Sequence, residues 1–199
     1  MKLLIGIPTV DYIHFKFVDC LTKLEKRLNE LKVDYDIWFK HCTMIHLGRD
    51  EIALHAIKNG YDKLLWFDAD MIFEPDIFEK LNSVDSPYVC GLFVSRHGGK
   101  SSCVFEQIRP DIRYKEYPDN PFPIQASGFG CVLTDVKMLE RIYNRNGTCF
   151  MPLQGYGEDL SFGIRVKDYK YSMMCNPDAT VGHIGQAVIW PKDRDYDFI

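Results

Sequence analysis

The feature that most constrains the fold is an alternation of short apolar runs with segments of helical periodicity in the first third of the chain. Residues 3–10 form a continuous apolar run, which is typical of a strand buried on both faces of a parallel sheet. Apolar residues then recur at helical spacing up to residue 31, with charged residues between them. Further apolar strands are expected over residues 35–42 and 64–67, separated by a helix over residues 49–59. This order of elements predicts an α/β fold with a mostly parallel central sheet flanked by helices.

The second half of the chain has a less regular pattern. Residues 95–123 are rich in Gly, Pro, Asp and Arg, so we expect a loop region with at most one hairpin there. A chain of 199 residues without an internal repeat or linker fits one folding unit, and we expect a single domain over residues 1–199. Helices are expected after Pro75, after residue 135 and over 158–168, and strands over 88–94, within 124–134 and, as the final strand, over 171–175.

Composition and charge argue against several classes of protein. The chain has 24 Lys and Arg against 28 Asp and Glu, a formal net charge of −4, so it lacks the basic character of proteins that grip a nucleic-acid backbone. No apolar stretch approaches the ~20 residues that a membrane span needs. The seven cysteines are dispersed and form no CxxC pair, which favours a reducing compartment. We therefore expect a cytoplasmic protein with no membrane span and no strong nucleic-acid signature.

Asp68 and Asp70 form the first candidate site, because they directly follow the apolar strand expected over residues 64–67. Open α/β sheets bind ligands at the carboxyl ends of their strands. Carboxylate oxygens are hard ligands that suit Mg²⁺ or Mn²⁺, and such an ion can bridge the phosphates of a nucleotide. Taken alone, the two aspartates could equally cap the next turn.

Two later motifs carry further polar groups. Glu158 and Asp159 fall on the first turn of an expected helix, where the positive end of the helix dipole favours ionised carboxylates. One of them could act as a general base, or the pair could be an ordinary acidic helix start. His183 lies between Gly182 and Gly185 and could complete a metal shell with an imidazole nitrogen, or could be an ordinary loop histidine.

The three motifs in this order resemble those of the GT-A glycosyltransferases, the nucleotide-diphospho-sugar transferase superfamily. Residues 48–76 are similar to that family's helix, strand and D-x-D segment, and residues 126–133 to its acceptor-side segment. Gly157, Glu158, Asp159 and His183 match its later motifs, so that the likeness spans roughly residues 3–185. The resemblance implies a GT-A fold, in which a Rossmann-like sheet is joined by a smaller acceptor-side region of strands and loops.

The resemblance also implies an activity, which is transfer of a sugar from a nucleotide-diphosphate donor to an acceptor hydroxyl. It implies Mn²⁺ or Mg²⁺ as cofactor and favours a UDP-sugar over a GDP-sugar. Asp70 and His183 would bind the metal, and Asp68, a third candidate ligand, would contact the ribose or a metal-bound water. Asp159 would be the catalytic base and Glu158 would hold a hydroxyl, an arrangement that favours inversion over retention at the anomeric carbon. Other implied donor-side residues are Pro8, Thr9 and Ala69, together with Arg49, which would help to hold the diphosphate. Gly128 and Phe129 are implied to shape the sugar and acceptor pocket.

Two other functions compete with this interpretation. A sugar-phosphate nucleotidylyltransferase shares the sheet architecture, but it carries a Gly-rich basic loop after the first strand, and residues 7–12 contain none. A non-catalytic module that binds a nucleotide-sugar or a glycan is the second alternative, and the intact set of acids at 68, 70 and 159 argues against it. The acceptor stays open between a glycan, a protein, a lipid and a modified nucleobase.

Some residues allow two interpretations or are assigned to the core. The basic residues of segment 96–100 could lie over a bound diphosphate or could form a solvated turn. The tail residues Lys192 and Arg194 could close as a lid or could be solvated. Tyr12 and Trp38 are expected in the core, as are Trp66 and most phenylalanines.

Overall fold

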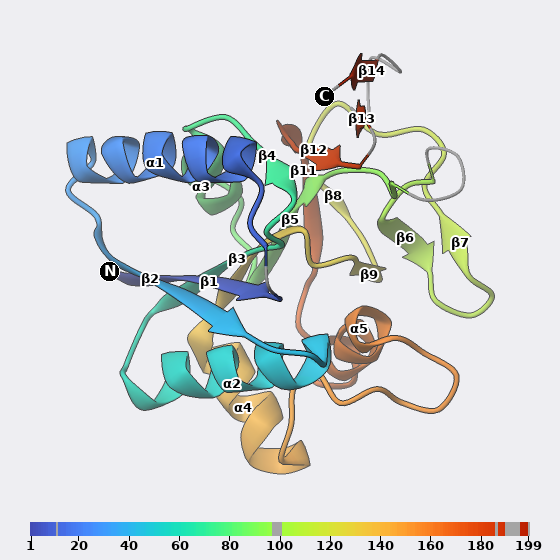
Figure 1. Ribbon diagram of the computed structural model, residues 1–199. Helices are drawn as coiled ribbons and strands as arrows, with labels where there is room; N and C mark the ends of the chain where they lie inside the picture. The colour runs from blue at the N-terminus through green and yellow to red at the C-terminus, as the bar shows by residue number, and fades with distance from the viewer. Residues whose placement is uncertain (11, 97–100, 186, 190–195, 199) are drawn as a thin grey trace.

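A seven-stranded sheet forms the centre of the computed structural model, which describes residues 1–10, 12–96, 101–185, 187–189 and 196–198 (Figure 1). The strand order is β2-β1-β3-β10-β5-β11-β8. β1 pairs in parallel with β2 and β3, and β5 pairs in parallel with β11, whereas β8 and β10 run antiparallel to their neighbours. The predicted mostly parallel sheet is confirmed. Its strands are β1 (Lys2–Thr9), β2 (Asp34–His41), β3 (Lys63–Phe67), β5 (Tyr88–Leu92), β8 (Phe122–Pro123), β10 (Cys131–Asp135) and β11 (Met174–Thr180).

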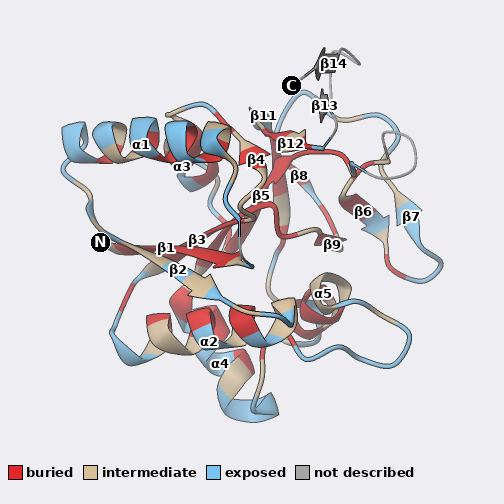
Figure 2. Cartoon of the chain, viewed as in Figure 1, coloured by how far each residue is buried: buried red, intermediate tan, exposed pale blue. Residues whose placement is uncertain are grey.

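Helices cover both faces of this sheet (Figure 1). Because successive side chains of a strand point to opposite faces, β1 contributes to both layers of the core. Leu3, Ile5 and Ile7 pack in the cluster that contains α1 and α3, and Leu4 packs in the cluster that contains α2, α4 and α5. Buried residues accordingly follow the sheet and the inner faces of the helices (Figure 2). The helices are α1 (Phe15–Glu30), α2 (Ile45–Lys58), α3 (Ile77–Asn82), α4 (Val136–Asn146) and α5 (Glu158–Asp168).

Two smaller sheets lie beside the central one, in agreement with the expected region of additional strands (Figure 1). One has the order β14-β13-β12-β4 and the other the order β7-β6-β9, in which β6 and β7 form the hairpin expected within residues 95–123. Their strands are β4 (Met71–Ile72), β6 (Val104–Gln107), β7 (Ile112–Arg113), β9 (Ala126–Ser127), β12 (Gly182–Ile184), β13 (Ala187–Ile189) and β14 (Tyr196–Phe198).

The first helix begins later than its apolar periodicity predicts. α1 starts at Phe15 because His14 acts as its N-cap, with Nδ1 accepting a hydrogen bond from the backbone N–H of Lys16. Residues 12–14 are not helical, and Tyr12, expected in the core, is 86% exposed.

The end of the chain also differs from the expectation. β11 starts at Met174 and extends to Thr180, and β12, β13 and β14 follow it, so the strand expected over residues 171–175 is neither the final one nor correctly bounded. The middle of β11 reads Asn-Pro-Asp, residue types that are depleted in strands. The pairing with β5 accommodates them through a register shift between Asn176 and Thr180.

None of the helices in the described ranges combines the length and the hydropathy of a transmembrane span.

Candidate active site

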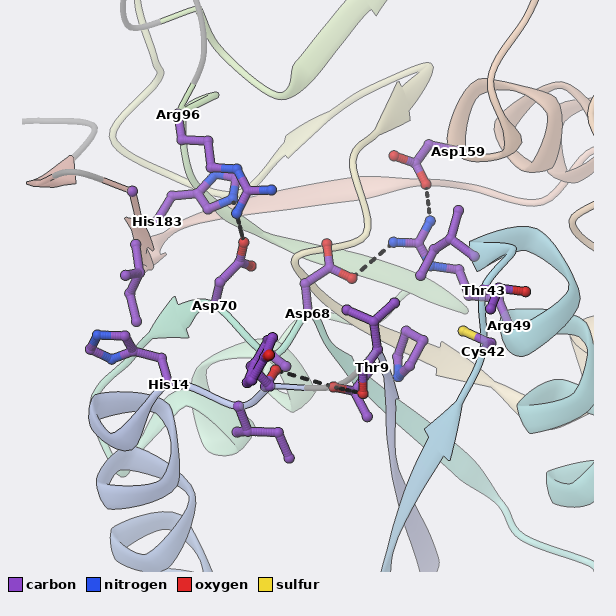
Figure 3. Close-up of a pocket in the computed structure, with 18 of the residues that line it drawn as sticks. Thr9, His14, Cys42, Thr43, Arg49, Asp68, Asp70, Arg96, Asp159 and His183 are labelled. Carbon is purple, nitrogen blue, oxygen red and sulfur yellow. Dashed lines mark hydrogen bonds and ion pairs between the residues drawn. The ribbon is translucent and has the colours of Figure 1, made fainter.

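A cavity of about 1220 Å³ lies at the carboxyl ends of β1 and β3, where an open α/β sheet is expected to bind its ligand (Figure 3). Segments far apart in the sequence form its wall: the β1–α1 connection, the start of α2, the residues after β3, the start of α5 and β12. Most of the site residues inferred from the sequence line it, namely Pro8, Thr9, Arg49, Asp68, Ala69, Asp70, Glu158, Asp159 and His183.

Arg49 gathers three carboxylates on one side of this cavity (Figure 3). Its Nη2 donates to Asp68 Oδ1 at 2.9 Å, and its Nη1 donates to Glu158 Oε1 at 2.9 Å and to Asp159 Oδ1. α2 begins at Ile45, so Arg49 lies within the helix and not at its start, and it is only 3% exposed. The guanidinium is therefore engaged by the protein's own acids, whereas the resemblance implies that it binds a diphosphate.

Asp159 has an unusual protonation equilibrium in this cluster. Burial raises the pKa of its carboxyl, the Arg49 guanidinium lowers it, and the nearby Glu158 and Asp68 carboxylates raise it again, which brings it from 3.8 to about 7. One positive charge shared by three carboxylates leaves the cluster negative, so a raised pKa has a clear electrostatic origin. A carboxylate that titrates near neutral pH is suited to accept a proton from a substrate. Figure 3 shows one oxygen of Asp159 directed at Arg49 and the other directed away from it.

Asp70 and His183 meet on the other side of the cavity. β12 pairs with β4, which places His183 opposite Met71, and the N–H of Ile184 donates to the carbonyl oxygen of Asp70 at 2.8 Å. His183 Nδ1 donates to the carbonyl oxygen of Val94 at 3.0 Å, and His183 Nε2 lies 3.4 Å from Asp70 Oδ2. A backbone carbonyl on one ring nitrogen is the usual way in which proteins orient the other nitrogen towards a metal.

These two side chains fit a divalent cation by their chemistry. A carboxylate oxygen and an imidazole nitrogen suit Mn²⁺, and phosphate or water oxygens can complete the coordination sphere. Although burial opposes it, contacts with His183 and Arg96 lower the pKa of Asp70, which keeps its carboxyl ionised at neutral pH. Among the described residues, no group of three or more His, Cys, Asp or Glu side chains could hold a metal. Asp68, the third predicted ligand, is turned towards Arg49.

Gly128 and Phe129 do not line this cavity. Phe129 is buried in an aromatic cluster that includes Phe162, and its ring lies 5.0 Å beneath the guanidinium carbon of Arg49. A Cβ atom at Gly128 would lie 3.1 Å from Cζ of Phe93, so this glycine permits close packing. In the structure, Phe129 thus lies behind the part of the cavity wall that Arg49 forms.

Several cavity residues were not identified from the sequence. Tyr12, Ile13 and Phe15 line the cavity, although Ile13 was expected on the apolar face of the first helix and Tyr12 in the core. The signal that could have separated Tyr12 and Ile13 from the helix is His14, a residue able to cap the helix that follows it. Arg96, by contrast, belongs to the basic segment 96–100 that the sequence pointed to, and it lines the cavity. The other residues of segment 96–100 and the tail residues Lys192 and Arg194 lie outside the described residues.

Comparisons with known proteins identify the fold. Neither a protein-family model nor a curated protein sequence matches the chain. Among solved structures, the chain is similar to A197 from STIV, with 18% identity, a TM-score of 0.71 and coverage of 100% of this chain and 94% of that one.

Enzyme structures also match. The catalytic domain of Drosophila beta1,4-galactosyltransferase 7 in complex with xylobiose has 13% identity and a TM-score of 0.56, with coverage of 100% of this chain and 70% of that one. A mutant of that enzyme in complex with manganese, UDP-Gal and xylobiose has 13% identity and a TM-score of 0.55, over 92% and 71% of the two chains. UDP-glucose pyrophosphorylase in complex with UDP-glucose has 9% identity and a TM-score of 0.52, over 88% and 89%. The chain thus has the GT-A fold, which glycosyltransferases and nucleotidyltransferases share.

Proposed function

We propose that the protein is a metal-dependent glycosyltransferase that moves a sugar from a nucleotide-diphosphate donor, with UDP-sugars favoured, to an acceptor hydroxyl. The observation that carries this proposal is the division of one cavity into two parts. Asp70 and His183 present a metal-binding donor pair on one wall, and Asp159 presents a carboxylate with a pKa raised to about 7 on another.

Asp70 and His183 would hold Mn²⁺ or Mg²⁺, which supplies compensation for the negative charge that develops on a leaving diphosphate. Pro8 and Thr9, at the end of β1, would lie against the base and ribose of the donor, with Tyr12 and Phe15 on the same wall. Asp68 and Ala69 would contact the donor from the end of β3. The likeness to an enzyme solved with manganese, UDP-Gal and xylobiose supports this class of donor and cofactor and favours a glycan as the acceptor.

Asp159 is proposed as the general base. Its Oδ1 is held by Arg49, so the second oxygen is oriented to take the proton from an acceptor hydroxyl as that hydroxyl attacks the anomeric carbon. The bond to the diphosphate breaks as the new glycosidic bond forms on the opposite face, which inverts the anomeric configuration. Glu158, bound to the same guanidinium, would hold a hydroxyl of the acceptor or donor.

A nucleotidyltransferase is the second candidate, because UDP-glucose pyrophosphorylase has a similar fold. The β1–α1 connection argues against it. This connection lacks the Gly-rich basic loop of that class and instead brings Tyr12 and Ile13 to the cavity.

Release of nucleoside diphosphate from a panel of UDP- and GDP-sugars, in Mn²⁺, Mg²⁺ or EDTA and with a mixture of glycan acceptors, tests the proposal. We expect metal-dependent release from one donor, abolished in Asp70→Ala and reduced about 10²- to 10⁴-fold in Asp159→Asn. Asp119→Asn is the matched control, since it removes an exposed carboxylate outside the cavity. Release of pyrophosphate from a nucleoside triphosphate and a sugar phosphate would favour the nucleotidyltransferase instead. Binding of a UDP-sugar without any turnover would favour a binding module.

A further inference from the structure

Asp70 Oδ2 has two basic neighbours. His183 Nε2 lies 3.4 Å from this oxygen, and Arg96 Nη1 forms an ion pair with the same oxygen (Figure 3). A divalent cation held between Asp70 and His183 would need that oxygen as its ligand. The guanidinium of Arg96 and the metal would then be two positive charges at one atom, and such charges repel strongly at a half-buried site. The two cations therefore compete for Asp70.

The cavity offers few cations for a diphosphate. Arg49 and Arg96 are the arginines that line it within the described residues, and no described lysine does so. Arg49 is buried and bound to three carboxylates, so its charge is already more than neutralised. Arg96 is bound to Asp70, and its side chain is 41% exposed towards the cavity and solvent.

We propose that Arg96 is a donor-binding residue that rests on Asp70 until a divalent cation takes the carboxylate, and that its guanidinium then binds the donor diphosphate. The planar guanidinium fork matches phosphate oxygens in a bidentate geometry. Arg96 thereby takes the role that the resemblance gives to Arg49. This inference rests on the proposed metal-dependent function of the same cavity.

The arrangement makes Arg96 affect the binding of the metal and the binding of the diphosphate in opposite directions. Without nucleotide, Arg96 weakens metal binding, because the metal must displace it from Asp70. With the metal bound, Arg96 strengthens binding of a nucleoside diphosphate. Replacing Arg96 by a neutral side chain must therefore change the two affinities in opposite directions, an effect that a purely structural role would not produce.

Two binding measurements test the proposal. Electron paramagnetic resonance of the free ion measures the affinity for Mn²⁺ alone, and calorimetry measures the affinity for UDP at saturating Mn²⁺. For Arg96→Ala we expect Mn²⁺ to bind more tightly and UDP more weakly than in the unaltered protein, each by at least about fivefold. Arg96→Lys keeps the positive charge but loses the planar guanidinium, so its affinity for UDP is expected to lie between those of the unaltered protein and Arg96→Ala. Arg145→Ala, at the end of α4 and outside the cavity, should leave both affinities unchanged.

The outcomes separate this proposal from the function on which it rests. Suppose that Asp70→Ala loses Mn²⁺ binding, while Arg96→Ala binds Mn²⁺ no more tightly than the unaltered protein. This result would overturn the role of Arg96 and leave the metal site in place. Unchanged UDP affinity in Arg96→Ala would overturn it as well. If Asp70→Ala binds Mn²⁺ as the unaltered protein does, the proposed metal site itself is wrong.

Discussion

Arg49 determines the electrostatics of one half of the cavity, because a single buried guanidinium compensates Asp68, Glu158 and Asp159 together. Its contacts join α2 to the end of β3 and to the start of α5. The same side chain therefore contributes to stability and positions the proposed base.

Arg49→Ala should lower the free energy of unfolding by about 3 kcal/mol, since removing one partner of a buried ion pair leaves uncompensated charge. The loss should be greater at pH 8 than at pH 5, because protonation relieves the repulsion between the remaining carboxylates. Urea unfolding at both pH values measures it. Lys26→Ala, an exposed cation on α1, is the control and should change stability little. A loss for Arg49→Ala no greater than the control's would show that the carboxylates do not depend on this arginine.

Asp159 is expected to determine how the proposed activity depends on pH. Because a base must be unprotonated, we expect kcat/KM to rise as pH increases through about 7, the pKa of this carboxyl in the folded protein. The residual rate of Asp159→Asn should not show that rise. A rise that persists in Asp159→Asn would assign it to another group.

The same pKa has an opposite consequence for stability. The folded pKa of Asp159 lies above its ordinary value of 3.8, so protonation favours the folded state. The stability that this group contributes is present below about pH 4 and is lost as pH rises through about 7. The proposed base thus becomes unprotonated in the pH range in which this contribution to stability is lost.

At the scale of elements, the position of α5 against β9 places Glu158 and Asp159 at the cavity. Gly163 is the point of close contact, since a Cβ atom there would lie 2.8 Å from Cβ of Ala126 and 3.0 Å from the carbonyl oxygen of Gln125. The carbonyl oxygen of Gln125 belongs to the backbone, so it cannot move aside as a flexible side chain could.

Gly163→Ala should therefore destabilise the protein by about 1 to 2 kcal/mol, because the overpacking cost exceeds the gain in helix propensity. Thermal unfolding measures this. Gly157→Ala, at the N-cap of the same helix, is the control without a packing contact, since its Cβ would meet no atom within 4 Å, and it should lose only the weaker capping of alanine. A Gly163→Ala variant as stable as the unaltered protein would mean that α5 can shift away from β9 without cost.

The elements that could be predicted are those whose pattern is local. β1, β3 and α5 follow from apolar runs and helical spacing, and the acidic motifs at residues 68–70 and 158–159 follow from their places at the ends of such elements. β4 and β12 could not be predicted, because each is two or three residues long and exists through pairing with a distant segment. That pairing is what brings His183 to Asp70.

The partners within the site were beyond a local pattern for the same reason. The sequence identified Arg49 as a basic residue near a helix start, but its three carboxylate partners come from distant elements and are specified by tertiary packing. Phe129 was assigned to the pocket from its motif, whereas its burial beneath Arg49 depends on the cluster around it. Which side chain meets which is decided by the fold as a whole.

At the scale of the whole molecule, the proposed ligand site is lined by segments from both faces of the central sheet, with Phe15 of α1 from one face and residues of α2 and α5 from the other. The cavity is formed by the β1–α1 connection, α2, α5 and β12, so a ligand that contacts all of them must bind the folded state in preference to the unfolded chain. Ligand binding and global stability are therefore linked. A single unfolding measurement can therefore test the proposed binding of both the metal and the nucleotide.

UDP with Mn²⁺ should raise the unfolding midpoint, because a ligand present at 100 times its Kd adds about 2.7 kcal/mol to the stability of the folded state. EDTA should remove most of this gain, and Asp70→Ala should lack the Mn²⁺-dependent part, since Asp70 carries the carboxylate of the proposed metal site. Asp159→Asn should keep the gain, because this residue is proposed to act on the acceptor and not on the donor diphosphate. Differential scanning fluorimetry of the three proteins, with UDP and GDP compared at equal concentration, measures these shifts. A gain with UDP that is the same in EDTA, or the same in Asp70→Ala, would show that the nucleotide binds without a cation on this carboxylate, and the donor would then depend on Arg96 and the β1–α1 wall alone.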